Sequence, residues 1–155
     1  MKLVTRDLLR QISEQAARSP ILRKNHNIHP CDDSRCHRLL NAIEPGSYIR
    51  PHRHLDPEKD EAFILMSGRL GIITFSDDGT VAEKVTLSHE SGVLAADIPY
   101  AVFHSAVSLE PGTVFYEVKA GPYLQLAEDE KAPWAPGNGD AAAPEYLEQL
   151  ARLFR

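Results

Sequence analysis

Two histidines with the spacing of metal ligands stand near the middle of the chain. His52 and His54 are separated only by Arg53. Alternate side chains of a β-strand share one face, so a strand here would turn both imidazoles the same way and Arg53 to the other side. Because neutral imidazoles are common ligands of divalent metals, the pair predicts part of a metal site.

A carboxylate ligand has two candidate positions after this pair. Glu58 belongs to a charged turn at residues 56–60, whereas Glu61 begins the otherwise apolar run 61–68. A charge in such a run needs a cation or tight hydrogen bonding if it is buried. Taken alone, Glu61 is more simply a solvated residue at the mouth of a strand. The preference for Glu61 over Glu58 comes from its place at the start of the strand and from the motif spacing described below, in which six residues separate the glutamate from Gly68.

A third histidine, His104, lies in the largely apolar segment 99–105. It is either a hydrogen-bonded core residue or a fourth ligand. With three imidazoles and one carboxylate, a metal that accepts five or six ligands keeps positions open for a substrate. The ligand set admits iron, nickel, manganese or zinc, and one divalent ion is expected. A metal-free alternative pairs His104 with Asp97 as a proton shuttle, but it leaves the other three residues without a role.

The elements around these residues are mainly β-strands. From about residue 38 to 126, short runs of β-formers alternate with turn signals, which is typical of an all-β sandwich or barrel. Asp78-Gly79 predicts a hairpin turn. Residues 4–18 have helical apolar spacing with Thr5 as N-cap, and Pro144 begins a second helix after a tail that Trp134 anchors.

The spacing of these residues resembles the two cupin motifs. The second motif departs from the usual pattern at Ala101, which replaces glycine, and at Ser108, which replaces asparagine. Neither position is a ligand, so the departures do not weaken the metal site. The matching positions are Gly46, His52, His54, Glu61 and Gly68 in the first motif, and Gly92, Pro99 and His104 in the second.

Over most of its length the chain is similar to the WbuC-type cupin metalloproteins of bacterial polysaccharide gene clusters. The segments that carry this resemblance are 17–20, 38–46, 51–54, 109–115, 117–119, 121–123 and 132–136. The resemblance implies an all-β cupin jelly-roll β-barrel, or double-stranded β-helix, as a single domain over 1–155. Its parts would be an N-terminal helix within 1–20, a barrel at about 38–126, and a tail with a short C-terminal helix at 127–155.

The expected function follows from the metal site and the resemblance together. We expect a metal-dependent enzyme, of oxygenase or isomerase and epimerase type, acting on a small carbohydrate-derived or anionic substrate of polysaccharide and O-antigen metabolism. A non-catalytic cupin that binds a sugar or metabolite, and a purely structural metal site, are the alternatives. No catalytic residue is assigned. Polar residues on or beside strands that would face the barrel interior are candidates for the substrate pocket, and a solvated or structural role is the alternative for each. They are His29, Asn41, Arg50, Glu117, Lys119 and Tyr123.

The composition limits the possible partners. The 155 residues carry a formal net charge of −5, which disfavours nucleic-acid binding because that binding needs a basic surface. Membrane insertion is not expected, since no apolar run approaches the roughly 18 residues that span a bilayer. We expect a cytoplasmic protein, and a homodimer is plausible because cupins often pair through barrel edges.

Charge and cysteine patterns add two further hypotheses. Residues 1–54 hold ten Lys/Arg against five Asp/Glu, whereas residues 55–155 hold seven against seventeen. The basic part is suited to an anionic ligand, unless the two parts interleave in the fold. Cys31 and Cys36 are interpreted as reduced and structural. A separate zinc site that combines them with His29 and His37 matches no common zinc spacing.

Overall fold

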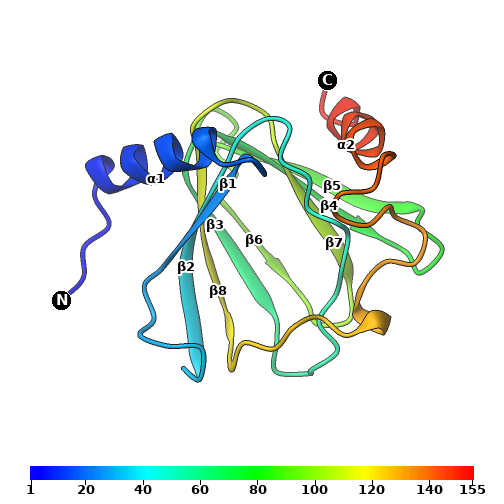
Figure 1. Ribbon diagram of the computed structural model, residues 1–155, viewed down its shortest axis with the longest axis horizontal. Coiled ribbons are helices and arrows are strands. Elements are labelled where there is room, and N and C mark those ends of the chain that lie inside the picture. Colours follow the sequence, from blue (N-terminus) through cyan, green and yellow to red (C-terminus); the bar gives the residue numbers. More distant parts are fainter.

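The computed structural model describes residues 1–155, which form two antiparallel β-sheets with one helix near each end of the chain (Figure 1). The larger sheet has the strand order β1-β2-β8-β3-β6, and the smaller has the order β5-β4-β7. The first four strands are β1 (Arg23–Asn27), β2 (Cys36–Ile43), β3 (Glu61–Ser67) and β4 (Arg69–Phe75). The others are β5 (Val81–Ser88), β6 (Ala95–Ile98), β7 (Phe103–Ser108) and β8 (Thr113–Ala120).

The helices lie on opposite sides of the molecule (Figure 1). Helix α1 (Arg6–Arg18) begins after Thr5, whose side chain accepts a hydrogen bond from the Leu8 amide at 3.2 Å, as the N-cap prediction requires. Helix α2 (Ala143–Arg152) carries Pro144 in its first turn. A short 3₁₀ helix (Glu128–Glu130) precedes it. None of the helices is both long enough and apolar enough to cross a membrane.

Three apolar layers explain why several strands are apolar on both faces. The largest layer fills the space between the sheets, with Phe63, Ile72 and Phe115 among its members. A second layer packs α2 and the tail against the outer face of β4 and β7. The third packs α1 against the outer face of β2 and β8. The outer faces of β2 and β8 and of β4 and β7 are therefore covered, whereas Ile64 of β3 and Val81 of β5 are exposed.

The N-terminal part of the larger sheet differs from the expectation. β1 occupies a stretch between the expected helix and the expected barrel to which we assigned no element, so the larger sheet begins before residue 38. Its sequence, RKNHN, lacks alternating apolar residues. The strand forms because it pairs antiparallel with β2, from Arg23 opposite Ile43 to Asn27 opposite Leu39. The strand therefore depends on backbone pairing with β2, which the periodicity of its own sequence does not reveal.

The segment that holds His52 and His54 is also different, because it is not a strand of either sheet. His52 forms only isolated bridges, with His104 and with Lys131. The expected separation of the side chains nevertheless holds. The Arg53 guanidinium lies 4.3 Å from the centre of the Phe103 ring and forms a 3.2 Å ion pair with Asp77, whereas His54 contacts Glu61.

The turn before β7 places Ala101 at a φ of +62°, in the left-handed region that favours glycine. Its amide donates a 2.7 Å hydrogen bond to the carbonyl of His54, so this turn helps to position a candidate ligand. Ala101→Gly should raise the free energy of unfolding by about 0.5 kcal/mol, because the relief of backbone strain exceeds the added entropy of the unfolded chain. Ala17→Gly, on the exposed face of α1, should instead cost about 1 kcal/mol. Urea titration measures both, and destabilisation by Ala101→Gly would contradict the prediction.

Candidate metal centre

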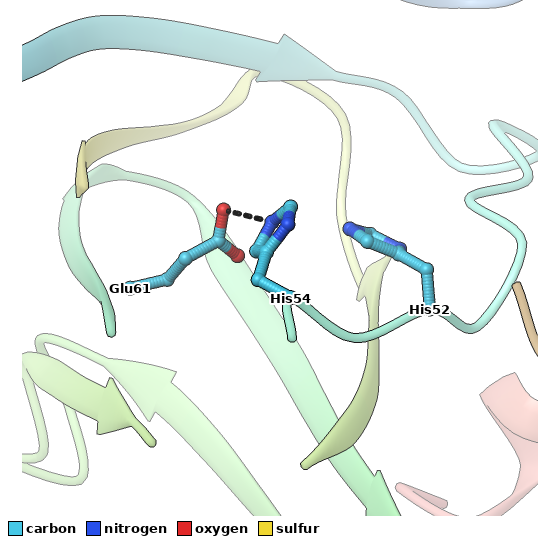
Figure 2. Close-up of side chains that lie close together, drawn as sticks. All are labelled: His52, His54 and Glu61. Carbon is cyan, nitrogen blue, oxygen red and sulfur yellow. Dashed lines mark hydrogen bonds and ion pairs between the residues drawn. The ribbon is translucent and has the colours of Figure 1, made fainter. Parts of the chain in front are cut away.

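The three residues predicted from the first motif converge in space. One ligand atom from each of His52, His54 and Glu61 lies within 4.8 Å of the other two. Figure 2 shows the histidines on the segment before β3 and the carboxylate of Glu61, at the start of β3, turned toward them. The sequence brings them together because β3 begins at Glu61, seven residues after His54.

His104, the fourth predicted ligand, lies beside this group on β7. Its Nε2 is 2.9 Å from Oε2 of Glu61, and its ring centre is 4.7 Å from that of His52. The backbone amide of His52 donates to the carbonyl of His104 at 3.0 Å, and the amide of His104 donates back at 2.8 Å. This reciprocal pair fixes the two residues relative to each other.

Backbone carbonyls orient two of the imidazoles. Nδ1 of His52 lies 3.0 Å from the carbonyl oxygen of Arg50, and Nδ1 of His104 lies 2.9 Å from that of Val102. A carbonyl only accepts, so each Nδ1 carries a proton, and in the neutral ring Nε2 carries the lone pair. Burial, followed by repulsion from His104, lowers the pKa of His52 to about 3. His52 is therefore a neutral ligand at ordinary pH.

Glu61 is only 2% exposed, although it is charged. Its Oε1 lies 3.0 Å from Nε2 of His54 and also accepts from the Lys119 ammonium. Burial by itself would raise the pKa of Glu61, but hydrogen bonds from His104 and His54, together with Lys119, hold it well below its usual range. The carboxylate is thus ionised, as a metal ligand must be.

Lys119 connects this centre to a second buried carboxylate. Its ammonium lies 2.8 Å from Oε1 of Glu117, whose other oxygen accepts from the Asn41 side-chain amide. Burial, followed by the negative charge of Glu61, raises the pKa of Glu117. Burial would lower the pKa of Lys119, but Glu117 and Glu61 together raise it. The three residues form one buried network beside the ligands.

A cavity of about 690 Å³ opens beside the candidate ligands. Its size falls within the range of small-molecule sites, which span about 300–1,000 Å³. Apolar side chains from the barrel core form part of its lining, and Tyr123, 58% exposed, stands at its edge. All six residues proposed from sequence as pocket candidates line it: His29, Asn41, Arg50, Glu117, Lys119 and Tyr123.

The cavity also has lining residues that we did not predict. Arg23, Asn25 and Asn27 come from β1, which the sequence pattern did not reveal as a strand. Phe63 was assigned only to an apolar run, although it lies two residues after Glu61 and therefore on the same face of β3. That alternation was the available signal for Phe63, whereas nothing in the sequence pointed to Asn138.

The alternatives considered from sequence fit the structure less well. Glu58 is exposed in its turn, and the metal-ligand group contains Glu61 instead. Asp97 is exposed and pairs with Ala62, so it occupies the face of the sheet opposite to Glu61 and cannot reach His104 as a proton-transfer partner.

The alternative zinc site does not form either. Cys31 and Cys36 are free and exposed, and Nε2 of His37 donates to the carbonyl of Asp32 at 2.9 Å. His29 and His37 stack with ring centres 4.1 Å apart, so they pack on each other rather than converge on a common point with the cysteines.

The chemistry of the donor set fits a divalent metal ion. The imidazoles of His52, His54 and His104 lie together with the ionised carboxylate of Glu61. The contacts of Glu61 with His54 and His104 each need a proton between the atoms. A divalent ion would replace those protons and compensate the buried negative charge. His54 would gain the same cation as a partner for its Nε2.

Comparison of the whole structure with known proteins identifies the fold. KdgF from Halomonas sp. is 20% identical, with a TM-score of 0.52 over 68% of this chain and 84% of that chain. TT1209 from Thermus thermophilus is 19% identical, with a TM-score of 0.54 over 77% and 97% of the respective chains. A cupin superfamily protein from Desulfitobacterium hafniense is 11% identical, with a TM-score of 0.50 over 63% and 76%. At these identities the likeness establishes the cupin β-barrel fold alone.

Sequence comparison places the chain in a family. No curated protein matches it. The model of a family described as a domain of unknown function, DUF6016, matches residues 4–87, which include His52, His54 and Glu61. That match covers more than half of the chain. The protein is therefore a member of the DUF6016 family, and it has the cupin fold that its motifs predicted.

Proposed function

We propose that this protein is a metal-dependent cupin enzyme that acts on a small polar substrate bound in the barrel cavity. The observation that carries the proposal is the convergence of three ligand atoms within 4.8 Å, next to a cavity with a largely polar lining. A metal centre that opens on such a cavity is suited to catalysis, because a substrate atom can reach the ion. The proposed ligands are His52, His54, Glu61 and His104.

The inclusion of His104 rests on its position and its tautomer. Its Nδ1 is held by a carbonyl and its Nε2 lies 2.9 Å from Oε2 of Glu61, so a divalent ion that replaced the proton between these two atoms would be bound by the lone pair of Nε2 and by the same carboxylate. With these four residues as ligands, the ion would supply Lewis acidity toward a substrate oxygen or, if it is iron, redox chemistry. Iron, nickel, manganese and zinc all accept this donor set.

The surrounding residues have separate roles in this proposal. Asn41 and Lys119 hold Glu117 in the cavity wall, where a carboxylate with a raised pKa is suited to transfer a substrate proton. Tyr123, at the edge of the cavity, offers an aromatic surface to a bound ligand. The sequence resemblance to WbuC-type cupins supports a carbohydrate-derived substrate of bacterial polysaccharide metabolism in the cytoplasm.

Metal content gives the first test. Protein purified without an affinity tag should hold close to one divalent ion per chain, and His104→Ala and His52→Ala should each lose most of it. His89→Ala is the matched control, because His89 is exposed and lies outside the ligand group. Elemental analysis gives the occupancy, and full occupancy in both ligand variants would contradict the four-ligand site.

Turnover of a panel of sugars, sugar acids and keto-acids by the metal-loaded protein separates an enzyme from a non-catalytic binder, which would bind a compound without converting it.

A further inference from the structure

The cavity contains two guanidinium groups that have no acidic partner in the chain. Arg23 and Arg50 both line it. Neither forms an ion pair with any carboxylate, although ion pairs exist elsewhere, including the one between Lys119 and Glu117. Each arginine instead donates one hydrogen bond to a backbone carbonyl, from Arg23 to Tyr48 at 3.0 Å and from Arg50 to Ala132 at 2.8 Å. Most of their donors are left without a partner in the chain.

Both side chains are partly buried, and the chain does not compensate the cost of that burial. Nε of Arg50 is buried without any hydrogen-bond partner, and burial lowers the pKa of Arg23. A buried charge that lacks a counter-charge is unfavourable. Glu128, whose charge interacts with that of Arg50 without forming an ion pair, is held at 2.7 Å by Lys131. No carboxylate of the chain therefore pairs with either guanidinium group, and a bound anion would supply the missing counter-charge.

The charges that are left unpaired in the cavity also favour a bound anion. The lining residues include the basic Arg23, Arg50 and Lys119 and the acidic Asp32, Glu61 and Glu117; Lys24 also borders the cavity, but its pairing with Ala42 turns its side chain to the opposite face of β1. Lys119 is occupied by Glu61 and Glu117. A divalent ion at the proposed metal centre would make the cavity more positive. Without a bound anion, the positive charge at Arg23 and Arg50 has nothing to neutralise it.

We infer that Arg23 and Arg50 form an anion subsite, and that the ligand is a small polyhydroxylated organic anion whose carboxylate or phosphate binds there. Guanidinium groups recognise both oxyanions through paired N–H donors. Asn25 and Asn27 line the same cavity, and their side-chain amides form no hydrogen bond within the chain, so they are available to hydroxyl groups. The inference rests on the proposed metal-dependent function, because the hydroxyl end of the ligand would face the metal centre.

The position of Arg50 links this subsite to that centre. Its carbonyl holds Nδ1 of His52, so the segment that carries the guanidinium also fixes a candidate ligand. Arg50 and His52 line one cavity. An anion bound by Arg50 would therefore be placed beside the metal centre rather than at a remote surface. A carboxylate or phosphate at one end of the ligand then determines which of its hydroxyl groups approaches the ion.

Calorimetric binding to the purified protein, with the metal content of each sample measured, tests the inference. The probes are D-gluconate as the carboxylate, D-glucose 6-phosphate as the phosphate and sorbitol as the neutral polyol. Wild type should bind at least one of the anions and bind sorbitol far more weakly. Arg50→Gln and Arg23→Gln should each weaken binding of that anion by about 10- to 100-fold, the range expected for the loss of a charge-assisted contact. Whichever anion is bound more tightly identifies the oxyanion that the subsite prefers.

Matched variants separate this result from failure of the metal site. Arg50→Lys keeps the charge but not the paired donors, so it should lose less affinity than Arg50→Gln. Arg18→Gln removes an exposed charge on α1 and should bind as wild type does. Unchanged anion binding in Arg50→Gln and Arg23→Gln with full metal content would overturn the subsite and leave the metal site intact. Equal binding of sorbitol and the anions, or no binding of either anion by wild type, would also overturn it.

Discussion

Glu61→Gln should lower the affinity of the protein for a divalent metal ion by more than about 100-fold. Glutamine has nearly the same shape, so the change removes the negative charge and the anionic ligand atom while the space stays filled. Substitutions in the outer shell of metal sites already cost about 10- to 100-fold in affinity, and loss of a direct ligand should exceed that range. The neighbouring carboxylate, Glu117, is held by Lys119 and Asn41, so it is not free to replace the lost ligand. Titration of the metal-stripped protein against a competing chelator measures the effect.

Glu58→Gln is the control for this change, because it removes an equal charge only three positions away. Glu58 is exposed in a turn, and the metal-ligand group does not include it. Its substitution should alter metal affinity by less than about twofold, since screened surface charges have little effect at a distance. Equal losses in the two variants would show that general negative charge, rather than the buried carboxylate, attracts the ion.

The ligands could be predicted from sequence because most of their geometry is local. His52, His54 and Glu61 lie within ten residues, and their order along the chain brings them together once β3 begins at Glu61. The motif spacing to Gly68 and the position at the start of a strand distinguished Glu61 from Glu58. His104 required the resemblance to a motif, because the contact that places it beside His52 is a backbone bridge between segments about fifty residues apart.

The network around Glu61 could be predicted only as a set of separate candidates. Lys119 contacts Glu61 because the two residues are paired across β3 and β8, and Glu61 is paired on its other side with Ile98 of β6. That register also puts Asp97 on the opposite face. Strand register depends on pairing between distant segments, so a one-residue shift would reverse these assignments without changing any local pattern. The side of the cavity formed by β1 was missed for a related reason, since its strand is maintained by pairing with β2 rather than by its own residues.

Lys119→Met should destabilise the metal-free protein by about 3–5 kcal/mol, the range observed when one partner of a buried ion pair is removed. Lys119 lies between Glu61 and Glu117, and it is the one ammonium or guanidinium group that pairs with either of these buried carboxylates. Methionine fills a similar volume but provides no charge, so two carboxylates would face each other in the barrel. For a chain of this size, a loss of 3–5 kcal/mol corresponds to a decrease in melting temperature of about 6–20 °C.

Bound metal should reverse much of this loss, because a divalent ion at Glu61 supplies the positive charge that the variant lacks. The metal-induced rise in melting temperature should therefore be larger for Lys119→Met than for wild type. Lys131→Met is the matched control: Lys131 pairs with Glu128, whose side chain is 90% exposed, and such surface pairs contribute less than about 1 kcal/mol. Calorimetric melting of both variants with and without metal distinguishes the effects. A similar loss in both variants, or a loss in Lys119→Met that metal does not reduce, would mean that Lys119 does not compensate the charge of the metal-binding carboxylate.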